Sequence, residues 1–155
     1  SACKAFAEYT IQNRLKTNQF AIIRLSNLYG YNQEKGIMAY LRRSFLSDRK
    51  LYFNNDGSLK RAYLNVEDCA NSLANVLLHK KDMLEGSYNF IGKDIFTIKE
   101  LVEKFEQLSQ VKFQVYFEDR LPYDNPEILR SHRWEMLSDY NAEHSVTDFF
   151  KRIVL

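Results

Sequence analysis

The sequence predicts an α/β fold, in which short strands alternate with helices along the chain. Residues 21–23 are an apolar, partly β-branched run, which is typical of a strand covered on both faces. Residues 61–66 alternate apolar and polar side chains, as a second strand would. Thr97 and Glu100 form a capping box that begins an amphipathic helix over residues 98–108. This alternation of strands and helices indicates a mixed architecture.

The remaining elements follow from the spacing of apolar side chains. Further helices are expected at residues 2–16, 37–46, 67–79 and 145–155. Further strands are expected at residues 51–53, 87–92 and 112–117. No linker-like stretch divides the 155 residues, so we expect a single unit.

Composition and charge argue against several classes of protein. The net charge is +2, and basic residues alternate with acidic ones, which gives no reason to expect a nucleic-acid partner. Cys3 and Cys69 are isolated thiols, so neither a metal site nor a disulfide framework is expected. We see no signal peptide and no apolar run long enough to cross a membrane. We therefore expect a cytoplasmic protein without a membrane partner.

Hydrogen-bonding side chains follow directly after the apolar run at residues 21–23. Arg24, Ser26 and Asn27 stand just past the carboxyl end of this expected strand. In open α/β sheets, ligands bind at that end of the strands. The segment is therefore a candidate binding loop, but an ordinary core strand followed by a surface loop would show the same pattern.

Four short motifs occur in order over residues 1–92. The first is Ser1-Ala-Cys-Lys4, and the second is Arg24-Leu-Ser-Asn-Leu-Tyr-Gly30. The third runs from Asp56-Gly-Ser through Arg61 to Val66-Glu-Asp68, and the fourth is Gly86-Ser-Tyr-Asn-Phe-Ile-Gly92. In this order and at these spacings they resemble the second half of the nucleotide-sugar epimerases and dehydratases of the extended short-chain dehydrogenase/reductase family.

This resemblance implies a fold and an activity. The fold would be the C-terminal part of a Rossmann-type doubly wound sheet plus a small substrate-binding lobe. Residues 1–35 would end the Rossmann domain, with later segments interleaved, and residues 36–155 would form mainly the lobe. The family's reaction begins with hydride transfer from a nucleotide-diphosphate sugar to NAD. An epimerase then returns the hydride to the other face, and a dehydratase first eliminates water; the motifs do not choose between epimerase, dehydratase and reductase.

The resemblance also implies which residues serve NAD. Lys4 would hold the nicotinamide ribose and lower the pKa of a catalytic tyrosine, which would stand one residue before Ser1. Leu25 and Ser26 would lie beside the nicotinamide. The glycine-rich GxxGxxG turn, which receives the dinucleotide pyrophosphate, does not occur in these 155 residues. We therefore expect a fragment that is inactive alone, while its intact parent binds NAD.

By the same resemblance, other residues would bind the sugar nucleotide. Arg61 would contact the diphosphate, because its fork of donors fits phosphate oxygens. The alternative for Arg61 is an ion pair with a neighbouring acid. Asn27 would reach the diphosphate or the sugar. The remaining assignments are Tyr52 and Phe53 beside the base, and Arg120 and Asp124 at the ribose and phosphate.

Other expectations concern structural residues, assembly and alternative functions. Asp68 is expected to tie the start of its helix to nearby backbone, and His132 and Trp134 are expected to pack locally. The intact protein is expected to form a homodimer through the helix at residues 2–16, as the family commonly does. Two alternatives stay open: a non-catalytic nucleotide-sugar-binding protein without the redox half, and an unrelated α/β domain with chance matches.

Overall fold

The computed structural model describes residues 2–120 and 132–155. Its helices are α1 (Ala2–Arg14), α2 (Ile37–Phe45), α3 (Val66–His79), α4 (Ile98–Ser109), α5 (His132–Ser138) and α6 (Val146–Val154), with 3-10 turns η1 (Thr17–Gln19) and η2 (Lys81–Met83). Its strands are β1 (Ala21–Leu25), β2 (Asn27–Tyr29), β3 (Lys50–Phe53), β4 (Arg61–Asn65), β5 (Gly86–Phe90), β6 (Asp94–Phe96) and β7 (Gln114–Phe117). The predicted mixed α/β class is confirmed. The division at residue 35 stays a prediction.

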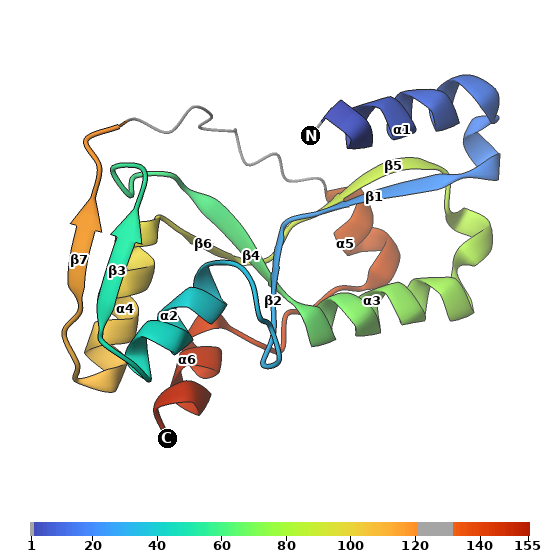
Figure 1. Cartoon of the computed structure of the whole chain (residues 1–155). Helices are drawn as coiled ribbons and strands as arrows, with labels where there is room; N and C mark the ends of the chain where they lie inside the picture. Colours follow the sequence, from blue (N-terminus) through green and yellow to red (C-terminus); the bar gives the residue numbers. More distant parts are fainter. Residues whose placement is uncertain (1, 121–131) are drawn as a thin grey trace.

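The strands form three small sheets, and most neighbouring strands run parallel (Figure 1). β1 pairs with β5, and β3 pairs with β7. β2 pairs in parallel with β4, which also pairs antiparallel with β6. A single residue, Ser26, separates β1 from β2, so one nearly continuous segment serves two sheets.

Two hydrophobic clusters stabilise the chain. The larger one joins α2, β3, α4 and α6, and its fully buried members include Leu41, Leu51, Leu101, Phe105 and Phe150. As predicted for the closing helix, α6 buries one apolar face. The capping box is also confirmed, because Thr97 Oγ1 accepts the Glu100 N–H at 3.1 Å and a Glu100 carboxylate oxygen accepts the Thr97 N–H at 2.6 Å.

The second cluster joins β4, β5, α3 and α5 around Trp134. The indole is fully buried, and its Nε1 donates to Ser72 Oγ at 3.0 Å. Its ring contacts Tyr88 and Phe90. The expected local packing of Trp134 is therefore confirmed, whereas the side chain of His132 lies outside the described part of the chain.

The first helix and strand are less buried than the sequence predicts. α1 ends at Arg14 instead of residue 16 and buries no side chain; Phe6 and Tyr9 are 71% and 64% exposed. Ile22 and Ile23 in β1 are only partly buried, so the prediction of a strand covered on both faces is wrong. The reason is that β1 pairs with β5 alone among the described strands, and α1 does not pack an apolar face against β1.

Three elements are absent from the sequence predictions. Residues 27–29, expected as a loop, form β2 because β4 supplies hydrogen-bonding partners along their backbone. β6 is three residues long and depends on its antiparallel contact with β4. α5 carries the buried Trp134, whose environment comes from distant parts of the chain. Such tertiary pairings are not visible in local periodicity.

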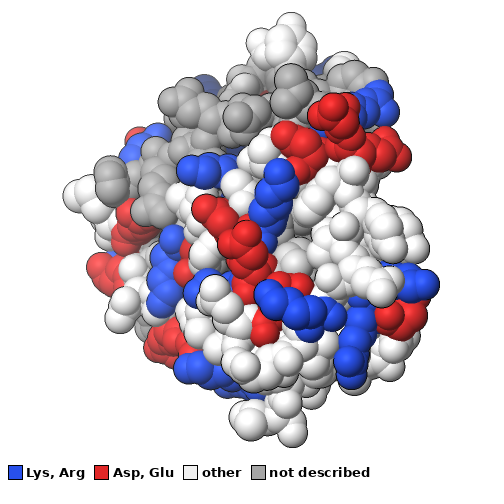
Figure 2. All heavy atoms as spheres, turned by 90° about the vertical axis from the view of Figure 1, so that its left-hand side faces the viewer, with Lys and Arg blue, Asp and Glu red and all other residues white. Residues whose placement is uncertain are grey.

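Figure 2 shows the face of the molecule on the side of β3 and β7. Basic and acidic side chains are mixed across this face, and neither sign forms a continuous area there. This distribution agrees with the small net charge of +2. In residues 2–120 and 132–155, no helix is both long enough and apolar enough to span a bilayer.

Gly92, just after β5, lies against the backbone of β4. A Cβ atom at this position would stand 1.8 Å from the carbonyl oxygen of Tyr63 and 2.7 Å from the Cα of Leu64. The Gly92 N–H donates to Ser26 Oγ at 3.0 Å. Only glycine allows three segments to meet this closely, because the overlapping atoms belong to the backbone and cannot rotate away.

Gly92→Ala is expected to lower the free energy of unfolding by about 3 kcal/mol or more, because the new methyl group forces β4 and β5 apart. Urea unfolding measures the change. Gln107→Ala, on the exposed face of α4, serves as a control and should shift stability by about 0.5 kcal/mol or less. A Gly92→Ala variant as stable as the unchanged protein would contradict the close approach.

Candidate functional site

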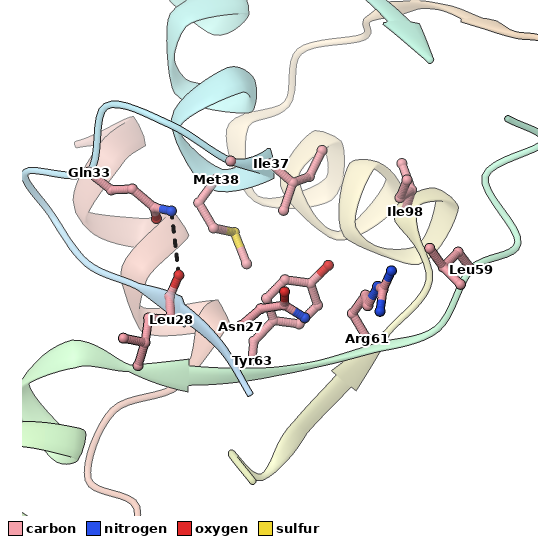
Figure 3. A pocket seen from close by; sticks show the side chains of 10 residues that line it. Asn27, Leu28, Gln33, Ile37, Met38, Leu59, Arg61, Tyr63 and Ile98 are labelled. Carbon is pink, nitrogen blue, oxygen red and sulfur yellow. Dashed lines mark hydrogen bonds between the residues drawn. The ribbon is translucent and has the colours of Figure 1, made fainter. Parts of the chain in front are cut away.

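A cavity of about 260 Å³ lies between the β2–β4 pair, the start of α2 and the start of α4 (Figure 3). Its walls combine apolar and polar side chains. The lining residues are Asn27, Leu28, Gln33, Gly36, Ile37, Met38, Leu59, Arg61, Tyr63 and Ile98. This volume suits part of a small molecule, and a mostly apolar wall with a few polar groups is typical of ligand sites.

The cavity brings together Asn27 and Arg61, two residues that the motifs single out. The parallel register of β2 and β4 places Asn27 opposite Tyr63, two residues from Arg61. Asn27 Nδ2 donates to the carbonyl oxygen of Ala62 at 3.2 Å, which fixes the amide on the cavity wall. The sequence segments of motifs two and three therefore meet in space.

Arg61 is partly buried at the beginning of β4. In the parts of the chain that the structure describes, no carboxylate forms an ion pair with its guanidinium. The alternative in which Arg61 pairs with a neighbouring acid is therefore not observed there. A partly buried cation without an acid partner favours an anionic ligand, because burial weakens its hydration.

Tyr63 also lines the cavity, and the sequence analysis did not assign it a role. Its side chain lies beside Asn27 and Arg61, with the hydroxyl toward the interior of the cavity (Figure 3). Burial raises the pKa of Tyr63 to about 12, while the Arg61 charge acts in the opposite direction. The hydroxyl is therefore neutral at physiological pH. The alternation along β4 could have identified Tyr63 from the sequence, because positions 61 and 63 lie on the same face of a strand.

The apolar part of the wall was also missed. Ile37 and Met38 come from α2, Leu59 from the segment before β4, and Ile98 from the start of α4. These residues are far apart in the sequence and carry no distinctive pattern beyond helix periodicity. Only the packing of α2 and α4 against β4 places them together.

Tyr52 and Phe53, predicted beside a nucleotide base, are not among the residues that line this cavity. Tyr52 is 59% exposed, and its ring stacks on that of Tyr116 at 4.8 Å between centroids. Phe53 stacks on Phe117 at 5.2 Å. The structure thus gives both rings neighbours on β7, and their contact with a base stays a prediction.

Arg120 and Asp124 were expected near ribose and phosphate. The carbonyl oxygen of Arg120 accepts the Asp56 N–H at 3.0 Å, so this backbone lies beside the segment that leads to Arg61. The Arg120 side chain is exposed and does not line the cavity. Asp124 lies outside the described residues.

The residues predicted for NAD are not gathered around the cavity. Lys4 is exposed on α1, and Leu25 is 40% exposed at the end of β1. Ser26 Oγ accepts the Gly92 N–H, as described above. None of the three lines the cavity with Asn27 and Arg61. Their contact with NAD stays a prediction.

Asp68, on the first turn of α3, has the structural role that was expected. It is buried, and its Oδ2 accepts the backbone N–H of His144 at 3.2 Å. Its Oδ1 lies 2.6 Å from His144 Nδ1. Asp68, Glu143 and His144 each offer an atom that could bind a metal ion, and these atoms lie within 4.8 Å of one another. The hydrogen bonds to His144 explain the position of Asp68 without a metal ion.

Several solved structures that share this fold are nucleotide-sugar epimerases or dehydratases. UDP-glucuronic acid 4-epimerase from Bacillus cereus, in complex with UDP-glucuronic acid and NAD, matches 84% of this chain with a TM-score of 0.75 and 22% identity. dTDP-glucose 4,6-dehydratase from Bacillus anthracis, in complex with NAD, matches 99% with a TM-score of 0.76 and 22% identity. UDP-glucose 4-epimerase from Bifidobacterium longum, with NAD⁺ and UDP, matches 86% with a TM-score of 0.68 and 19% identity.

The chain spans about half the length of these structures, with 42%, 48% and 46% of the three chains covered. At identities this low, the TM-scores show that the fold is shared and do not show a shared function. No protein of curated function matches the sequence. The family model for NAD dependent epimerases/dehydratases matches residues 1–92, which is more than half of the chain. The chain therefore belongs to the NAD dependent epimerase/dehydratase family.

Proposed function

We propose that this chain forms the nucleotide-sugar-binding part of an NAD-dependent epimerase or dehydratase and corresponds to its C-terminal half. The observation that carries the proposal is the cavity in which Asn27 and Arg61 meet. The two residues lie 34 positions apart in the sequence, and the β2–β4 pairing brings them to one wall. Support also comes from the solved relatives, which include complexes with UDP and with UDP-glucuronic acid.

Each polar group of the cavity has a defined task in this proposal. The guanidinium of Arg61 binds the diphosphate, and hydrogen bonds between charged groups contribute about 1.5–3 kcal/mol each. The neutral hydroxyl of Tyr63 donates a hydrogen bond, since burial keeps its proton in place. Asn27 presents its side-chain oxygen while its Nδ2 is held by Ala62. The apolar wall excludes water from the uncharged part of the ligand.

The reaction of the whole protein requires groups beyond this cavity. NAD would supply the hydride acceptor for the sugar carbon, and we propose that a tyrosine and a glycine-rich turn outside these 155 residues complete that chemistry. Lys4, Leu25 and Ser26 are the residues of this chain proposed to face the cofactor in the intact protein. The exposed Phe6 and Tyr9 on α1 support a homodimer contact through this helix.

Arg61→Ala is expected to weaken the binding of UDP-, GDP- or dTDP-sugars by about 10- to 100-fold, because the phosphate loses a charge-assisted donor pair. Calorimetric titration measures the change in Kd. Arg61→Lys keeps the charge but loses the fork, so an intermediate loss is expected. Arg14→Ala, on the exposed end of α1, is the control for removing one positive charge. Equal affinity in Arg61→Ala and the unchanged chain would refute the phosphate role.

Titration of the isolated chain with NAD is expected to show no measurable binding and no turnover of nucleotide sugars. The reason is that Lys4, Leu25 and Ser26 are exposed or partly exposed and are not gathered around a cavity with Asn27. Tight NAD binding by these 155 residues would contradict the proposal. Nucleotide-sugar binding by the intact protein without any NAD binding would instead favour the non-catalytic alternative.

Stability should fall as the pH rises from about 10 to about 12. An unfolded tyrosine loses its proton near pH 10, whereas burial holds the proton of Tyr63 until a pKa of about 12. The stabilisation that comes from the protonated Tyr63 is therefore fully present below pH 10. It is lost as the pH rises through the folded pKa of about 12, and the free energy of unfolding falls by up to about 3 kcal/mol. Tyr63→Phe should flatten this part of the pH profile in urea unfolding, and the exposed Tyr9→Phe should not. Burial also raises the pKa of Tyr29 and Tyr140. Stability of the Tyr63→Phe variant should therefore still fall with rising pH, but less steeply than that of the unchanged chain.

A further inference from the structure

The loop between β2 and α2 forms one wall of the cavity and has little packing of its own. Gln33 and Gly36 line the cavity of about 260 Å³. On another side the loop borders an open hollow of about 510 Å³, and beside the start of α3 it borders one of about 360 Å³. Residues 31, 32, 34 and 35 are exposed. Buried apolar contacts therefore contribute little to the position of this wall.

Two adjacent arginines of α2 donate hydrogen bonds to the loop. Arg42 Nη1 donates to the carbonyl oxygen of Tyr31 at 2.7 Å, and Arg43 Nη1 donates to that of Glu34 at 2.6 Å. Both are short bonds from a charged donor, and such bonds contribute more than those between neutral groups. They join the loop to the helix that follows it.

The hydrogen bonds of Gln33 are local by comparison. Its N–H donates to the carbonyl oxygen of Gly30 at 3.2 Å, and its Nε2 donates to that of Leu28 at 3.4 Å. These bonds shape the loop but do not attach it to α2. Among the described residues, neither Arg42 nor Arg43 forms an ion pair with a carboxylate. The loop carbonyl groups are therefore the partners that these two guanidinium groups have there.

The helix that carries the two arginines also supplies part of the cavity wall. Ile37 and Met38, at the start of α2, line the cavity together with Gln33 of the loop (Figure 3). Gly36 joins the loop to the helix with a φ of +87°, which other residues rarely adopt. Glycine gives a junction more conformational freedom than any other residue. The two arginine bonds therefore keep the loop wall and the helix wall in one arrangement.

We propose that Arg42 and Arg43 are positioning residues of the ligand cavity, which hold the loop wall in the arrangement that fits the bound molecule. The inference rests on the proposed function. Neither arginine lines the cavity, so each acts through the loop. Gln33 and Arg61 stand at opposite ends of the lining residues (Figure 3). With the diphosphate at Arg61, the loop wall faces the uncharged part of the ligand.

The test is calorimetric titration of Arg42→Met and Arg43→Met with UDP-glucose and dTDP-glucose. Methionine keeps an unbranched side chain and removes the donors. Binding is expected to weaken by about five- to tenfold in each variant, the effect of one hydrogen bond, and further in the double variant. Arg14→Met, at the exposed end of α1, removes one positive charge elsewhere and should bind as the unchanged chain does.

Salt separates positioning from attraction between the arginine charges and the diphosphate. The Debye length falls from about 10 Å at about 0.1 M salt to about 3 Å at about 1 M. The ratio of the Kd of Arg42→Met to that of the unchanged chain should be the same at both concentrations, because the position of the loop is not screened. A ratio that falls to one at high salt would overturn the positioning role. Arg42→Lys should restore part of the affinity, since its ammonium keeps a donor for the carbonyl oxygen.

Trypsin cleavage after Lys35 reports on the loop in the absence of a ligand. Lys35 is exposed in the loop, and cleavage there follows the population of chains in which the loop has opened. Mass spectrometry identifies the bond that is cut. Arg42→Met and Arg43→Met should be cut there about five- to tenfold faster than the unchanged chain, and Arg14→Met should not. Equal rates in all four proteins would overturn the proposal.

The titrations also distinguish this inference from the function on which it rests. Equal affinity of Arg42→Met, Arg43→Met and the unchanged chain for both ligands would overturn the role of the arginines and leave the proposed function in place. Absence of any nucleotide-sugar binding by the unchanged chain would overturn both.

Discussion

The approach of Gly92 to the backbone of β4 is the constraint on which the site depends. At this point the end of β5, the link between β1 and β2, and the middle of β4 come together. The Ser26 N–H donates to the carbonyl oxygen of Phe90, and Ser26 Oγ accepts the Gly92 N–H. Because Ser26 directly precedes β2, these two bonds fix where β2 begins and therefore which residue of β4 stands opposite Asn27. A shift of one residue would turn the side chains of β2 to the other face.

Much of the fold was predictable from the sequence because its signals are local. The capping box at Thr97 and the apolar spacing of α6 depend on a few consecutive residues, and both elements were predicted close to their observed bounds. Asn27 and Arg61 could be selected from motifs, but their meeting in one cavity depends on the β2–β4 pairing. Tyr63 carries no motif of its own. Its place on the cavity wall and the burial that raises its pKa exist only in the folded chain.

The failures at α1 and β1 have one cause. Apolar periodicity predicts that a face will be covered, but it does not say by which segment. In the described chain α1 is attached to the rest through polar contacts such as the Arg24 pair with Glu8, whose side chains are 49% and 26% exposed. That pair lowers the pKa of Glu8, yet exposed pairs of this kind contribute only about 0–1 kcal/mol. The position of α1 therefore depends less on packing than that of α3 or α4.

Stability and binding are linked at the cavity. Arg61 is partly buried without a carboxylate partner among the described residues. Partial burial of this charge raises the free energy of the folded chain, because polar atoms removed from water need replacement partners. Under the proposed function, an anionic ligand at Arg61 offsets this cost, and it does so only in the folded state. Binding energy gained in this way appears directly as resistance to unfolding, in proportion to the logarithm of ligand concentration.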